Sequence, residues 1–274
     1  MVRCMTHVLD EAIAGSYDDA GLYQAQTHEA YANMVGPFGG STAATVLHAL
    51  TAHPEQTGEP LALTLNFAAP IAYGAWQIRP QLIRTNRTNQ HWTFTVEQDG
   101  AVVGSGSAVF GITRDTWSDV EATPPTVPPA AEVELTPFPE FIGWARSYEK
   151  RIITGTWDSP SEDSTTTMWI RDAPARPLDF PALAGLSDTF APRVFVRHAN
   201  YMPTGTITMT TYFHATSAEL AAHGDDYVLA TARGARFGNG HFDQYGQLWG
   251  GPDHALLLAT THQLCYFKDP APAQ

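Results

Sequence analysis

Alternating apolar and polar residues mark four strand-like segments in the first half of the chain. They cover residues 61–67, 76–85, 92–98 and 101–110. A period of two is typical of strands with one buried face. The pair Asp99-Gly100 between the last two segments is typical of a tight hairpin turn. The pattern therefore predicts an antiparallel sheet.

A helical pattern precedes these strands. Residues 43–50 place Ala43, Val46, Leu47 and Leu50 on one helical face, directly after Gly39-Gly40-Ser41. Glycines before a helix leave its first N–H groups accessible, and Ser41 is the expected cap.

The second half repeats the same order of elements. A helix is predicted over residues 181–190, followed by strands over 206–214, 227–237, 242–249 and 255–267. The sequences LTLNFAA and MTTYFHA align from Leu63 and Met209. One helix followed by antiparallel strands, occurring twice, fits two curved sheets that each wrap a helix and pair as a pseudo-dimer. Two unrelated α+β domains remain an alternative on periodicity alone.

Proline density marks the boundary between the halves. Residues 121–131 contain four prolines, a density that favours extended polyproline II and excludes a packed element. We therefore expect a first domain over residues 1–116, a linker over 117–137 and a second domain over 138–274.

Composition and charge limit the classes of partner and the compartment that are expected. The net charge is −13 with only two lysines, which disfavours nucleic acid and anionic membranes as partners. Ten of the 15 basic residues follow position 137, so an anionic substrate finds its cations more easily in the second half. Two cysteines are too few for a disulfide framework, and the sequence shows neither a membrane-spanning run nor a signal peptide. A cytoplasmic location is expected.

Short motifs give the chain a family resemblance. The runs LAGLSDTFAP from Leu183, GTITMTTYFH from Gly205 and ATTHQL from Ala259 occur in order, and Phe38-Gly39-Gly40 opens the first helix. Together they resemble the acyl-CoA thioesterase II family over residues 36–267. The resemblance implies a tandem double hot-dog fold of the α+β class and hydrolysis of fatty-acyl thioesters in fatty acid metabolism. It also implies acyl-CoA as the partner, a homo-oligomer, and neither cofactor nor metal.

The resemblance also implies a set of catalytic residues. The family's water-activating triad falls on Asp188, Thr206 and Gln263 of this sequence. Their types suit the chemistry, because an attacking water needs a proton acceptor and groups that hold it in line. The N–H groups after Gly39 and Gly40 would bind the substrate carbonyl. No nucleophilic serine or cysteine is needed, so direct attack by water without an acyl-enzyme is expected.

The internal repeat places this chemistry in one half. Aligning the halves sets Pro60 against Thr206, Ala108 against Gln263, and residues 42–43 against Asp188. The first half therefore lacks the polar members of the set. One departure concerns Thr208, since many relatives have an acidic residue two positions after the threonine.

Less specific interpretations stay open. Asp188 could be an ordinary surface carboxylate, Thr206 an ordinary strand residue and the glycines packing residues. The protein could bind acyl thioesters or lipids without catalysis, or could be another hot-dog enzyme acting on carrier-bound acyl groups. The sequence contains no Gly-x-Ser-x-Gly elbow, which argues against an α/β-hydrolase.

Overall fold

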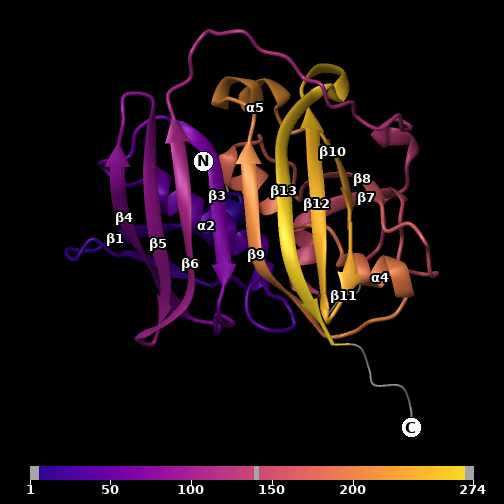
Figure 1. Ribbon diagram of the computed structural model, residues 1–274, viewed down its shortest axis with the longest axis horizontal. Coiled ribbons are helices and arrows are strands. Elements are labelled where there is room, and N and C mark those ends of the chain that lie inside the picture. The colour runs from indigo at the N-terminus through magenta and orange to yellow at the C-terminus, as the bar shows by residue number, and fades with distance from the viewer. Residues whose placement is uncertain (1–5, 139–141, 269–274) are drawn as a thin grey trace, which may run out of the picture.

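A single antiparallel sheet runs through the molecule, as the computed structural model shows for residues 6–138 and 142–268 (Figure 1). Its strand order in that part of the chain is β1-β2-β4-β5-β6-β3-β9-β13-β12-β10-β8-β7, and β11 pairs with β12. The strands are β1 (Gly15–Tyr17), β2 (Tyr23–Gln26), β3 (Glu59–Phe67), β4 (Ala75–Thr85), β5 (Asn89–Gln98), β6 (Ala101–Gly111), β7 (Tyr148–Thr154), β8 (Thr166–Asp172), β9 (Thr204–Phe213), β10 (Val228–Arg233), β11 (Phe237–Gly238), β12 (His241–Gly250) and β13 (Leu256–Phe267). The two halves join where β3 pairs with β9.

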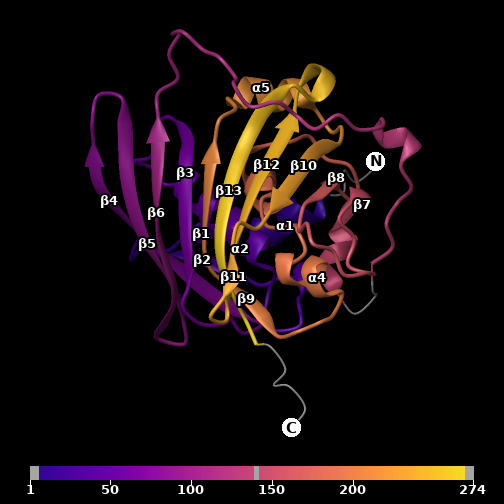
Figure 2. The same ribbon diagram turned by 45° about the vertical axis from the view of Figure 1, so that its right-hand side comes forward.

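Two central helices fill the concave side of the sheet (Figures 1 and 2). These are α2 (Gly39–Thr51) in the first half and α3 (Phe180–Leu186) in the second, and they pack against each other. Gly40 permits the close contact, because a Cβ there would lie 2.5 Å from the carbonyl oxygen of Gly185. Each half of the continuous sheet curves around one helix, which confirms the predicted tandem double hot-dog.

Shorter helices complete the fold. They are α1 (Val8–Ile13), α4 (Arg193–His198) and α5 (Ser217–His223), with 3-10 turns η1 (Glu29–Tyr31), η2 (Ala130–Glu132), η3 (Gly143–Ser147) and η4 (Pro252–His254). Within the described ranges, no helix is both long and apolar enough to cross a membrane.

The proline-rich segment packs against the second half as well as connecting the two halves. It leaves β6, passes over one end of the sheet and descends along the second half (Figure 1). Val127 and Val133 pack against a cluster on the outer face of that half, and the Trp169 indole donates a hydrogen bond to the Pro128 carbonyl at 2.9 Å. This cover buries both faces of β8, which explains why that strand shows no alternation and was not predicted.

Three details of the predicted elements were wrong. The helix α2 begins at Gly39, and Ser41 is not its cap, because the Ser41 hydroxyl donates to the Phe38 carbonyl at 2.7 Å. The helix α3 ends at Leu186, so Asp188 lies in the turn that follows. The strand predicted over residues 227–237 is two strands, β10 and β11, separated by a loop.

The halves match in their irregularities as well as in their strands. In β3 a bulge at Leu61 separates Pro60, opposite Phe110, from Leu63, opposite Ala108. In β9 a bulge at Ile207 separates Thr206, opposite Cys265, from Met209, opposite Gln263. In both halves the unpaired residue therefore follows the first paired residue directly and precedes the second by two positions. This agreement supports the alignment of the two halves.

Candidate active site

Asp188 lies where the two halves meet. Its turn follows α3 of the second half, yet its carboxylate faces the first turn of α2 in the first half. The Gly40 N–H lies close enough to this carboxylate to lower its pKa, and a Cβ built on Gly39 would lie 2.7 Å from Asp188 Oδ2. No side chain of α2 caps its own N-terminus. An anion from the other half takes that position, as the helix dipole favours.

Gln263 connects Asp188 to Thr206. Its Nε2 donates to Asp188 Oδ1 at 2.8 Å, and its Oε1 accepts from the Thr206 hydroxyl at 3.4 Å. The amide is held at both ends, which fixes its donor toward the carboxylate. Gln263 is 3 % exposed, so this network lies on the buried face of the sheet and not on its outer face. The structure thus brings all five predicted residues, including Gly39 and Gly40, to one place.

The bulge at Ile207 decides which threonine joins this network. Because Ile207 is left unpaired, Thr206 lies opposite buried Cys265 and points inward. Thr208 lies opposite Leu264, which is 40 % exposed, on the outer face of the sheet. A side chain at position 208 therefore points away from Asp188, and an acidic residue there would not reach this carboxylate in this chain.

The environment of Asp188 suits a proton acceptor. Protein surrounds the carboxylate on most sides, although part of its surface is accessible. Burial raises its pKa to about 7, against the opposing effects of the hydrogen bonds from Gln263 and Gly40 and the charge of Lys150. A carboxylate with a pKa near neutrality is a stronger base than an ordinary aspartate and still ionises at physiological pH.

Sequence reasoning missed Lys150. Its side chain is 2 % exposed and points inward from β7 beside the Asp188 turn. A signal was present: Tyr148, Lys150 and Ile152 occupy one face of a strand, so the lysine takes an apolar position. The rarity of lysine in this sequence was a second signal, because the chain contains only two lysines.

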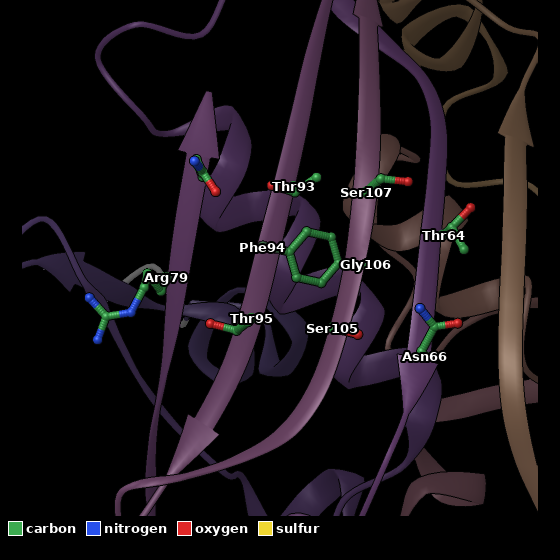
Figure 3. Close-up of a pocket in the computed structure, with 10 residues that line it drawn as sticks. Thr64, Asn66, Arg79, Thr93, Phe94, Thr95, Ser105, Gly106 and Ser107 are labelled. Atoms are coloured by element: carbon green, nitrogen blue, oxygen red, sulfur yellow. The ribbon is translucent and has the colours of Figure 1, made fainter. Parts of the chain in front are cut away.

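A hollow of about 410 Å³ lies elsewhere, on the outer face of the first half (Figure 3). Hydroxyl and amide side chains line it: Thr64, Asn66, Gln81, Thr93, Thr95, Ser105 and Ser107. Its one cation, Arg79, is paired with Glu97 at 2.9 Å. None of the predicted site residues lines this hollow, so its size does not mark the candidate active site. Across residues 6–138 and 142–268, no cluster of three or more histidine, cysteine or acidic side chains could hold a metal ion.

Two family models match the chain. Residues 28–111 match the acyl-CoA thioesterase N-terminal domain, and residues 121–267 match the acyl-CoA thioesterase C-terminal domain. No curated protein matches the sequence.

Solved structures match almost the whole chain. A protein of unknown function with a hot dog fold from Alicyclobacillus acidocaldarius is 47% identical, with a TM-score of 0.93, over 97% of this chain and 100% of that one. An acyl-CoA thioesterase II from Mycobacterium marinum is 18% identical, with a TM-score of 0.76, over 96% and 99% of the two chains. The tesB protein of Mycobacterium avium subspecies paratuberculosis is 17% identical, with a TM-score of 0.75, over 96% and 100%.

Proposed function

The chain belongs to the acyl-CoA thioesterase family, and from that premise we propose that it hydrolyses fatty-acyl thioesters of coenzyme A by direct attack of water. The observation that carries the proposal is the hydrogen-bonded chain from Thr206 through Gln263 to Asp188, which ends against the first turn of α2.

Each residue has a role in this proposal. Ionised Asp188 takes a proton from the attacking water, while Thr206 and Gln263 orient that water. The Gly40 N–H acts on Asp188, and Gly39 at the start of α2 binds the thioester oxygen as negative charge develops there. The oxygen of the water ends in the fatty acid, and the sulfur leaves as the thiol of coenzyme A with the proton that Asp188 took from the water.

Release of free thiol tests the activity directly. The protein is incubated with short, medium and long acyl-CoA substrates, with Asp188→Asn as the control. We expect thiol release from the wild type and an unmodified protein mass after rapid quenching, because no acyl-enzyme forms. Binding of acyl-CoA without thiol release would favour the non-catalytic alternative. An acyl adduct on the protein would contradict direct attack by water.

The pKa of Asp188 predicts a pH profile. Because the base acts in its ionised form, kcat/KM should fall about tenfold per pH unit below pH 6. It should level off once the pH exceeds the Asp188 pKa of about 7. A steady-state series from pH 5 to 9 measures this. A flat profile across pH 7 would mean that Asp188 does not supply the base.

Gly39→Ala should lower kcat by roughly 10- to 100-fold, because the new methyl group would lie 2.7 Å from Asp188 Oδ2 and 3.3 Å from the Phe67 ring. The matched control is Gly238→Ala, where a Cβ meets nothing within 4 Å. Equal turnover in the two folded variants would remove Gly39 from the site.

The oligomeric state, the location and the metabolic role of the protein are also proposals. A homo-oligomer is supported by large side chains exposed on the outer face of the second half, where Tyr212, Tyr245, Leu264 and Tyr266 are 39–51 % exposed. Sedimentation velocity over a concentration series tests it, and a monomer throughout would contradict it. A cytoplasmic location and a role in fatty acid metabolism stay predictions.

A further inference from the structure

Lys150 places its amino group in the interior of the second half. Its Nζ donates to the Thr189 carbonyl at 3.0 Å and lies 4.0 Å from the centre of the Trp144 ring and 4.6 Å from that of Phe138. One carbonyl and two aromatic faces compensate only part of the cost of burying an ammonium group. Burial accordingly shifts the pKa of Lys150 well below its usual value.

Asp188 is the acidic residue whose charge acts on Lys150. It precedes Thr189, whose carbonyl Lys150 holds, and its charge raises the pKa of Lys150 while Lys150 lowers that of Asp188. Among the described residues whose pKa is shifted, Tyr148 and Cys265 are also influenced by the charge of Asp188, and burial raises the pKa of both, which keeps them neutral. Lys150 is the charged side chain that lowers the pKa of Asp188.

The same side chain reaches the first half through its aromatic neighbours. Trp144 stacks on Phe38 with ring centres 4.2 Å apart and an interplanar angle of 7°. Phe38 is the residue directly before Gly39, at the start of α2. Lys150 thus contacts the turn that carries Asp188. It also contacts Trp144, whose stacking on Phe38 helps to position α2 opposite that turn.

We propose that Lys150 is a positioning residue for the reaction, which anchors the Asp188 turn and supplies the counter-charge for the ionised carboxylate. The proposal rests on the proposed function, in which Asp188 is the base. Lys150 is not assigned a contact with substrate.

The kinetic test uses two substitutions and a matched control. Lys150→Met removes the charge and the hydrogen bond to Thr189, and Lys150→Gln removes the charge but retains a donor. Lys268→Met makes the same change at the other lysine, which is exposed. In both Lys150 variants the acid limb of kcat/KM should move up by about 1 pH unit or more, a loss of about tenfold at pH 6.5 that is largely recovered at pH 9. Lys268→Met should follow the wild type. An acid limb that coincides with the wild type in either folded Lys150 variant would overturn the proposal.

A second measurement needs neither activity nor a Lys150 variant. Carbon-13 labelling at lysine Cε gives two signals from the full chain, and Lys268→Met assigns them. In Asp188→Asn the Lys150 signal should titrate about 1 pH unit or more lower than in the wild type, because the stabilising anion is gone. An unchanged midpoint would overturn the proposal whether or not the protein hydrolyses thioesters. A shifted midpoint in a protein that releases no thiol would support the charge pairing and contradict the proposed function instead.

Discussion

Asp188→Asn should lower kcat for acyl-CoA hydrolysis by roughly 10²–10⁴-fold, because the amide cannot take a proton from water. The substitution is nearly isosteric, so an oxygen remains to accept from Gln263 Nε2 or the Gly40 N–H. The measurement is kcat at saturating substrate and pH 8, where the wild-type carboxylate is ionised. Turnover equal to the wild type in a folded variant would remove Asp188 from the mechanism.

The same variant should gain stability at high pH. The pKa of Asp188 is about 7 in the folded protein against an ordinary 3.8, so the folded state binds the proton more tightly than the unfolded state. The free energy of unfolding therefore falls as the pH rises from about 4 to about 7, by at most about 4 kcal/mol. Asparagine removes this cost. Thermal unfolding should show a higher Tm than the wild type at pH 8 and little difference at pH 4. A lower Tm at pH 8 would mean that ionised Asp188 stabilises the fold.

Gln263→Ala should lower kcat by roughly 10²-fold or more. The variant loses the amide that donates to Asp188 at 2.8 Å and accepts from Thr206, so neither group is held in line. Truncating a side chain that is 3 % exposed also leaves a cavity, so the comparison requires folded protein at saturating substrate.

Ala108→Gln is the mirror variant. Ala108 is 1 % exposed and lies opposite Leu63, as Gln263 lies opposite Met209. A bulky amide there should cost about 1–3 kcal/mol of stability through overpacking and leave kcat unchanged. If Ala108→Gln abolishes turnover while Gln263→Ala retains it, the chemistry belongs to the first half. If neither changes turnover, the active site lies elsewhere.

The sequence by itself predicted the repeated order of helix and strands. Strands with one buried face alternate in polarity, and this holds for β3, β5 and β13, whose outer faces meet solvent. The same rule explains the failures. β8 is buried on both faces under the proline-rich segment, and β7 carries an inward lysine, so neither shows the apolar alternation that marks a strand.

The proposal of Asp188, Thr206 and Gln263 as a set also came from the sequence, through a family resemblance carried by short, local motifs. Their arrangement did not. Asp188 serves as the anion at the start of a helix about 150 residues earlier in the chain, and no local pattern records a contact between halves.

Only the tertiary structure decided which face each residue of β9 presents. Strand periodicity would place Thr206 and Thr208 on the same face, because side chains alternate with a period of two. One unpaired residue, Ile207, reverses that order and turns Thr206 toward Gln263 while Thr208 faces outward. A bulge depends on the register of β9 against β13, which is set by packing across the whole sheet and not by the residues of the strand alone.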